Sequence, residues 1–355
     1  MRLSLSLASV LFSLAATLAH ADPLDDTAAN PPATGALVIR AQPDGPAQQA
    51  GVRPGDVVTR YAGAPMTGME DLTAAVTANA KAKGKLDLTY VRGAGQPVTV
   101  QLPPGKLGLG VVGVQQGKPL QLRPPATDAG FDLAAYKAAP RDEWYAVHGG
   151  GAHVGFQHDR VEVKGDTVVV TTEYAIAGAG GPRHYLVTLT ATTEPRPKLI
   201  EARYVAPLDR ASVCTLTPTG NGKLLVKISE DGKTRERTLD LPADAMHENL
   251  ALQLAAAMPM RAGACAHFRS TTLFGEPADP SAVSVGEPAQ IDADGAKVTA
   301  TPVTIFGLAK KGATAWVDPA TRTVVKFDYP NGATATRTTR DKALAGINPK
   351  LKPQS

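Results

Sequence analysis

The sequence predicts a mainly β protein of the α+β class, built from two domains that follow one another along the chain. The chain has 355 residues, which is enough for two domains with cores of their own. It contains 34 glycines and 29 prolines but only 5% aromatic residues, a composition that favours many short strands joined by turns. From residue 143 onward, short β-prone runs alternate with turn signals. We therefore expect a small α+β domain first, followed by an antiparallel β-sandwich or open barrel with one or two helices.

The first 21 residues have the pattern of a targeting segment. Arg2 precedes an apolar and small-residue run over Leu3–Leu18, and Ala19-His20-Ala21 forms an A-x-A cleavage site. The run is shorter than the roughly 20 apolar residues that span a membrane. We expect residues 1–21 to be a signal peptide cleaved after Ala21, and the mature protein to be periplasmic or secreted, with no transmembrane segment. The Pro-, Ala- and Asp-rich residues 22–34 are expected to form a disordered lead.

Residues 45–66 carry the most informative local pattern, a short helix, two glycine turns and a strand. Pro46 suits the first position of a helix, and Gly51 supplies the left-handed residue at which a helix ends. Gly55-Asp56 and Gly63 mark the two turns, and Val57, Val58 and Tyr61 form the β-prone run between them. A longer helix follows, and Thr67 and Glu70 have the spacing of a capping box at its start.

This block, with Ala36–Gln42 before it and Asp71-Leu72 after it, resembles the PDZ domain of bacterial HtrA-type periplasmic proteases. The resemblance implies a PDZ fold over residues 35–112. It also implies a module that binds peptides and performs no chemistry, so the expected partner is a protein C-terminus or an extended peptide.

PDZ domains add an extended peptide to a sheet edge and hold its terminal carboxylate in a loop of the form apolar-Gly-apolar. Residues 30–33, which precede the domain, do not match this loop, whereas Lys106–Val111 resembles it and would supply it in a circularly permuted domain. Leu109–Val114 would then be the strand that lines the groove. The expected peptide-binding residues are Leu107, Gly108, Leu109, Gly110, Val111, Met69, Thr73 and Val76. The alternative is that this segment is only the strand that leads into the next domain.

The second half begins after a Pro/Gly-rich linker at residues 113–127 and is expected to be one β-rich domain over 128–345, with a C-terminal tail at 346–355. One apolar helix is expected over Asp244–Ala257. This half of the chain resembles bacterial envelope proteins of the β-clam type, such as periplasmic lipoprotein carriers. The resemblance is carried by residues 143–156, this helix and residues 315–332. The resemblance implies a curved antiparallel sheet that wraps a helix and shelters an acyl chain.

The chain has two cysteines, Cys214 and Cys265. In an oxidising compartment a structural disulfide between them is expected, and two thiols are the alternative.

Neither catalysis nor a metal or other cofactor is predicted. His148, His153 and His158 lie close together, but their five-residue spacing favours hairpin histidines over a zinc site. No nucleophile elbow is present. The net charge of +4, without a Lys/Arg block, argues against a nucleic-acid partner. The sequence thus favours a non-enzymatic adaptor of the cell envelope over two alternatives: a carrier of lipid or lipoprotein acyl chains, and an enzyme whose site only the fold assembles.

Overall fold

The computed structural model describes residues 23–355 except 43, 123, 125–126, 128, 134–140, 179–180, 207–211, 272–278, 308–309, 352 and 354–355. The expected signal peptide lies outside the described residues. Within the described part of the chain, no helix is both long and apolar enough to cross a membrane.

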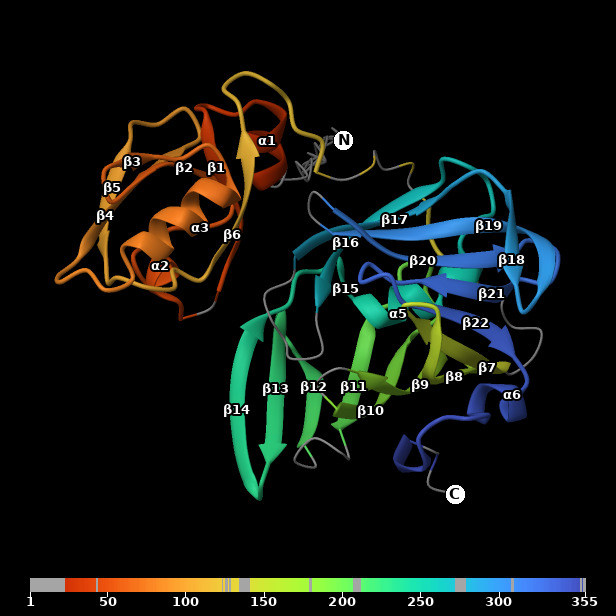
Figure 1. Ribbon diagram of the computed structural model, residues 1–355. Helices are drawn as coiled ribbons and strands as arrows, with labels where there is room; N and C mark the ends of the chain where they lie inside the picture. Colours follow the sequence, from red (N-terminus) through yellow and green to blue (C-terminus); the bar gives the residue numbers. More distant parts are fainter. Residues whose placement is uncertain are drawn as a thin grey trace, which may run out of the picture.

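The first domain is a six-stranded antiparallel sheet with the strand order β5-β4-β2-β1-β6, in which β3 pairs with β2 (Figure 1). Its core gathers apolar side chains from the sheet and from two of its three helices, including Val38, Val58, Leu72 and Leu88. The elements are α1 (Pro23–Ala29), β1 (Gly35–Ala41), α2 (Pro46–Gln49), β2 (Asp56–Tyr61), β3 (Ala64–Pro65), α3 (Met69–Ala78), β4 (Leu86–Arg92), β5 (Val98–Leu102) and β6 (Leu109–Val114).

Glycines flank helix α2 on both sides and precede helix α3. Helix α2 begins at Pro46 and is followed by Gly51, whose φ of 88° is the left-handed conformation expected there. The expected capping box at α3 does not form. Gly68 is the N-cap, and both the backbone N–H and the hydroxyl of Thr67 donate to the carboxylate of Asp71 in place of Glu70. Both hydrogen bonds lower the pKa of Asp71, and the bond from the Thr67 hydroxyl has the larger effect.

The expected disordered lead is wrong, because residues 23–29 form helix α1. Leu24 and Ala28 are buried against Leu37, Val57 and other apolar side chains on the face of the sheet opposite α3. The backbone N–H of Leu120 donates to the carbonyl of Ala28 at 2.8 Å. Composition suggested disorder, but tertiary packing decides whether so short a helix forms.

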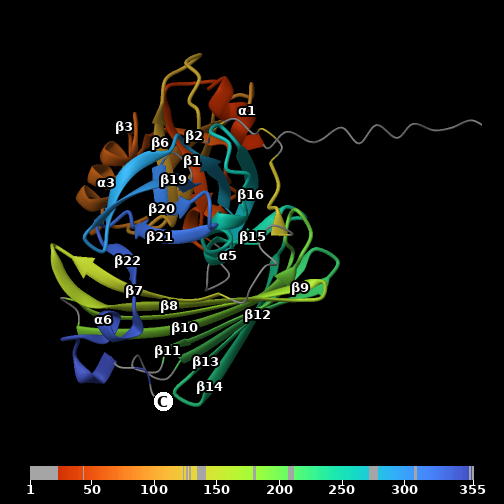
Figure 2. The same ribbon diagram turned by 90° about the vertical axis from the view of Figure 1, so that its right-hand side faces the viewer.

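The second domain is one 16-stranded sheet, antiparallel except where β15 pairs with β16. Its strand order is β14-β13-β12-β11-β10-β9-β8-β7-β22-β21-β20-β19-β17-β16-β15, with β18 on β19. The two halves meet where β22 pairs with β7, and they fold toward one another with helix α5 between them (Figures 1 and 2). The large open antiparallel sheet, accompanied by few helices, confirms the predicted fold class.

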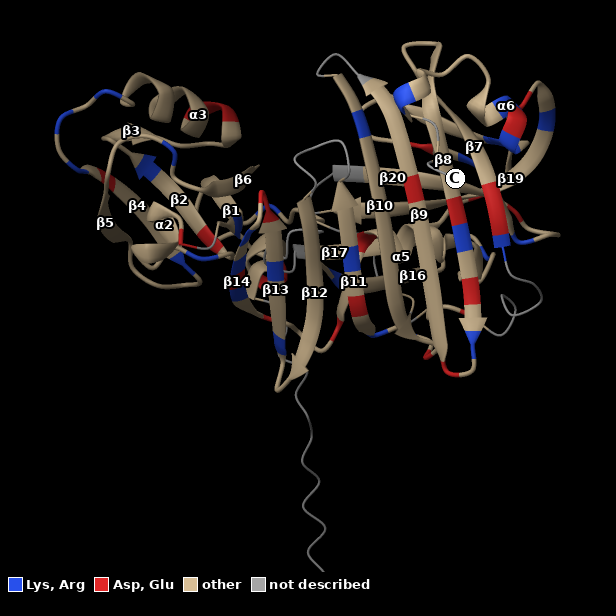
Figure 3. Cartoon of the chain, turned by 90° about the horizontal axis from the view of Figure 1, so that it is seen from below, with Lys and Arg blue, Asp and Glu red and all other residues tan. Residues whose placement is uncertain are grey.

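The strands of the first half are β7 (Arg141–Gly149), β8 (Ala152–Lys164), β9 (Thr167–Gly178), β10 (Gly181–Thr192), β11 (Leu199–Ala206), β12 (Ser212–Gly220), β13 (Lys223–Glu230) and β14 (Lys233–Asp240). Those of the second half are β15 (Ala245–His247), β16 (Cys265–Thr271), β17 (Asp279–Val285), β18 (Ala289–Ala293), β19 (Ala296–Gly307), β20 (Lys310–Asp318), β21 (Thr323–Asp328) and β22 (Thr334–Thr338). Acidic and basic positions are interspersed along the first-half strands, without a block of one sign (Figure 3).

The helix expected over Asp244–Ala257 is shorter than predicted. Residues 245–247 form β15, helix α5 spans Glu248–Gln253, and a 3-10 turn, η1, follows at Ala255–Ala257. The His247 imidazole caps the helix by accepting from the backbone N–H of Asn249. Leu250 and Leu254 are buried in the core between the halves of the sheet.

The C-terminal tail expected at 346–355 is packed against the sheet in its described part. Helix α6 (Arg340–Leu344) lies against β7 and β8, and the 3-10 turn η2 (Pro349–Leu351) lies against β9 and β10. Ile347 and Leu351 are buried beside Phe156 and Ala175. The segment therefore covers part of the outer face of the first half of the sheet.

The predicted disulfide is wrong: no disulfide joins Cys214 and Cys265. Both are buried, but Cys214 lies on β12 and Cys265 on β16, near opposite ends of the strand order. The Sγ of Cys265 lies 3.9 Å from the carbonyl oxygen of Pro124. A disulfide requires the two Cα atoms to approach within about 7 Å, a condition that the tertiary structure decides and that a count of cysteines cannot show.

We expect the folded protein to react very slowly with Ellman's reagent. Burial raises the pKa of Cys214 to about 11, and the thiolate is the reactive form. Unfolding in denaturant without reductant should expose both thiols, and dithiothreitol should leave the melting temperature unchanged. Absence of titratable thiol after unfolding would contradict this assignment.

Candidate functional site

Strand β6 offers an unoccupied sheet edge next to a helix. It pairs with β1 on one side and ends the strand order on the other, where α3 runs alongside (Figure 1). A cavity of about 540 Å³ separates the two elements. An extended peptide placed there could continue the sheet by pairing with β6.

The loop that precedes β6 directs two backbone amides away from the sheet. The carbonyl of Gly108 accepts from the N–H of Gln42 at 2.7 Å, and the carbonyl of Leu107 accepts from the N–H of Ala47 at 3.2 Å. In a trans peptide the carbonyl and the following N–H point in opposite directions, and the described chain contains no cis peptide. The N–H groups of Gly108 and Leu109 therefore point toward the groove, as an anion-binding loop requires.

Glycine is required at two points along this strand. Gly108 has a φ of 73°, and a Cβ there would lie 3.1 Å from Cβ of Gln42. A Cβ on Gly113 would lie 2.7 Å from the carbonyl oxygen of Thr67, just before α3. The groove is thus closed near Gly113 and open near Gly108, so a peptide's terminal carboxylate would lie at the Gly108 end.

The groove has apolar walls and a cationic end. Its wall on α3 is formed by Leu72, Thr73, Val76 and Thr77, and its other lining residues are Arg40, Gln42, Lys106, Leu107, Gly108, Leu109 and Gly110. Lys106 and Arg40 add positive charge to the lining, and Lys106 directly precedes the loop residues Leu107 and Gly108 in the chain. The site therefore combines an edge strand, an apolar wall and cationic and N–H groups at one end.

The structure brings most of the predicted peptide-binding residues together. Leu107, Gly108, Leu109, Gly110, Thr73 and Val76 all line the groove. Val111 follows on the same strand, but its side chain is buried in the core of the first domain. Met69 is 53% exposed at the start of α3 and lies outside the lining.

Sequence reasoning missed five lining residues. Lys106 and Thr77 adjoin predicted residues and could have been included. Leu72 is buried in the core of the first domain, and it also lines the groove. Arg40 and Gln42 belong to the β1 region, and only the pairing of β1 with β6 brings them to the site.

The three clustered histidines of the second domain do not share one site. His148 and His153 face each other across the β7–β8 hairpin, with ring centroids 5.3 Å apart. His158 stacks on Trp144 at 3.9 Å, and its Nε2 lies 2.5 Å from Oδ1 of Asp142. Among the residues that the structure describes, no group of three or more metal-binding side chains forms.

Comparison with known proteins identifies the first domain. The chain matches no curated protein. Among solved structures it is similar to a DUF1089 family protein from Pseudomonas aeruginosa, with 16% identity, a TM-score of 0.28, and coverage of 50% of this chain and 90% of that one. Residues 37–88 match the family model described as the PDZ domain, and this part of the chain is accordingly a PDZ domain.

Proposed function

We propose that this protein is a non-enzymatic adaptor of the cell envelope, whose PDZ domain binds the C-terminus of a partner protein as an added strand on β6. The observation that carries the proposal is the open edge of β6, with α3 on one side and the Gly108 and Leu109 amides at one end. The chain order, in which the groove strand comes last, supports a circularly permuted domain of the HtrA type. The pattern of residues 1–21 supports a periplasmic or secreted location.

The groove also defines the peptide that it would accept. The last side chain would lie between Leu107 and Val76, where the walls are apolar. The carboxylate would accept from the loop amides near Lys106, and charge-assisted hydrogen bonds of this kind are stronger than neutral ones. The partner would therefore end in an apolar residue with a free carboxylate.

The test is a screen of the chain from residue 22 to 355 against fluorescein-labelled peptides of one sequence, with a free or an amidated C-terminus. Fluorescence polarisation should show binding that amidation weakens at least about tenfold, since amidation removes the charge. Equal affinity for both forms would contradict the proposed carboxylate site.

We expect Val76→Asp to weaken binding of the free-carboxylate peptide by about 100-fold, roughly 2.7 kcal/mol. The new carboxylate would remove an apolar contact and repel the peptide's own carboxylate. Val76 is half-buried at the groove, so the fold should tolerate the change.

Ala74→Asp is the matched control for this variant. Ala74 is exposed on the same helix and does not line the groove, so the same new charge should leave the affinity nearly unchanged. Unchanged binding in V76D, with a native circular dichroism spectrum, would show that the peptide lies elsewhere.

A further inference from the structure

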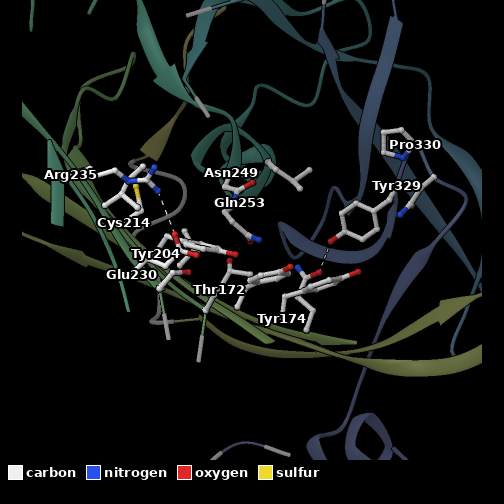
Figure 4. Close-up of a pocket in the computed structure, with 18 residues that line it drawn as sticks. Thr172, Tyr174, Tyr204, Cys214, Glu230, Arg235, Asn249, Gln253, Tyr329 and Pro330 are labelled. Carbon is white, nitrogen blue, oxygen red and sulfur yellow. Dashed lines mark hydrogen bonds and ion pairs between the residues drawn. The ribbon is translucent and has the colours of Figure 1, made fainter. Parts of the chain in front are cut away.

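The β-rich domain contains a cavity of about 820 Å³ between the concave face of its sheet and helix α5 (Figure 4). Ligand sites for small molecules typically measure about 300–1,000 Å³. Protein interiors otherwise pack with few voids larger than a water molecule. An open pocket of this size beside helix α5 is therefore a candidate ligand site.

The floor of the cavity is a cross-strand row of side chains that extends over seven neighbouring strands. Gln157 on β8 is opposite Tyr174 on β9, which is opposite Tyr185 on β10. The row continues from β10 to β14 through Val187, Tyr204, Cys214, Ile228 and Arg235, each opposite the next. Because the row follows strand pairing, its side chains are held on rigid elements.

Aromatic rings are concentrated in this cavity. The chain has eight tyrosines, and four of them line it: Tyr174, Tyr185, Tyr204 and Tyr329. The rings of Tyr185 and Tyr204 stack with centroids 5.3 Å apart, and those of Tyr174 and Tyr329 meet edge to face at 6.3 Å. Tyrosine offers an apolar face for ring stacking and a hydroxyl for hydrogen bonding.

Polar groups enter the cavity from both walls. Asn249 and Gln253 descend from α5, opposite Thr172 on the floor (Figure 4). Gln157 accepts from the hydroxyl of Tyr329 and donates to Asp159 at 2.6 Å, which fixes the orientation of its amide. The buried hydroxyl of Thr172 has no hydrogen-bond partner among the described residues, and an acyl chain would offer it none, at a cost in free energy.

The lining carries no net charge. Its only charged side chains among the described residues are Glu230 and Arg235, which pair with each other at 3.4 Å. They are 33% and 74% exposed, so the pair lies at the rim. An ionised ligand inside would lose its hydration without gaining a countercharge.

We propose that this cavity binds an uncharged small molecule with a flat ring, which stacks on the tyrosines and presents hydroxyl or carbonyl groups at its edge to the amides. The proposal is independent of peptide binding by the PDZ domain. It differs from the acyl-chain carrier considered from the sequence, because tyrosines and amides rather than aliphatic side chains dominate the lining.

Calorimetric titration with 2-naphthol, an uncharged ring with one hydroxyl at its edge, tests the proposal. The charged ring 2-naphthoate and the uncharged alkyl chain 1-decanol serve as comparison ligands. We expect 2-naphthol to bind at least tenfold more tightly than either. Tighter binding of 1-decanol would establish an acyl-chain site and overturn the proposal, as would the absence of 2-naphthol binding.

Variants locate the binding within the domain. Tyr204→Leu should weaken 2-naphthol at least tenfold, whereas Tyr204→Phe, which keeps the ring, should retain most of the affinity. Val205→Ala changes the next residue on β11, which faces the other side of the sheet at a separate hollow, and should have no effect. Ala206→Phe fills the cavity from its floor and should abolish binding while the domain stays folded. Unchanged binding in folded Y204L and A206F would overturn the assignment of the site.

Discussion

Replacing Asp159 by asparagine is expected to raise the free energy of unfolding of the β-rich domain at pH 8 by up to about 4 kcal/mol. Asp159 lies on β8 and is only 3% exposed. Burial raises its pKa from 3.8 to about 7, although the hydrogen bond from the Gln157 amide and the nearby polar side chains of Thr172 and Gln253 act in the opposite direction. Asparagine keeps a similar shape and removes the charge that burial penalises.

The direction of the pH dependence follows from the two pKa values. Between pH 3.8 and about 7 the folded state holds a proton on Asp159 that the unfolded state has released. This contribution to stability therefore falls as the pH rises through that window, by about 1.4 kcal/mol per unit. Above pH 7 the folded protein carries the full penalty of a buried carboxylate. Denaturant unfolding of wild type and D159N at several pH values from 4 to 8 measures the difference.

His247 provides a control of the opposite sign. It is fully buried, and burial lowers its pKa from 6.5 to about 4. Its contribution to stability is therefore present above pH 6.5 and lost as the pH falls toward 4. His247→Asn keeps a helix-capping side chain. Relative to wild type, it should raise the free energy of unfolding at pH 5 rather than at pH 8. If the free energies of unfolding of wild type and D159N change with pH in parallel, the buried carboxyl of Asp159 is not the cause of the pH dependence.

The second large effect is expected from Leu24→Ala, which should destabilise the PDZ domain by about 2–4 kcal/mol. Leu24 is 1% exposed and anchors α1 against Leu37 and Val57. Truncation would leave a cavity between the helix and the sheet, and the helix is too short to persist without that contact. Thermal unfolding, together with the rate of proteolysis within residues 22–34, measures the loss.

Asp26→Ala is the matched control for the same helix. Asp26 is exposed in the first turn, where its negative charge favours the helix by only a few tenths of a kcal/mol. Proteolysis that is rapid in wild type and unchanged in L24A would mean that α1 does not dock in solution.

Much of the PDZ groove could be predicted because its signals are local. Gly51, Gly63 and Gly108 occupy left-handed positions that only a few residue types adopt at low cost, so their spacing marks turns directly. The strand and helix that form the groove are continuous segments with their own periodicity. The capping of α3 was predicted less well, because Asp71 and Glu70 compete for the same donors and the exact geometry selects one.

The sequence by itself determined the class of the fold, the turn positions of the PDZ domain and most of the residues that line its groove. Tertiary structure alone decided the features that depend on distant segments. It packs α1 and the C-terminal segment onto sheets, leaves Cys214 and Cys265 without a disulfide between them, and brings Tyr174, Tyr204 and Tyr329 to one cavity. The physical reason is that strand order and burial set these contacts, and neither is encoded in the spacing of neighbouring residues.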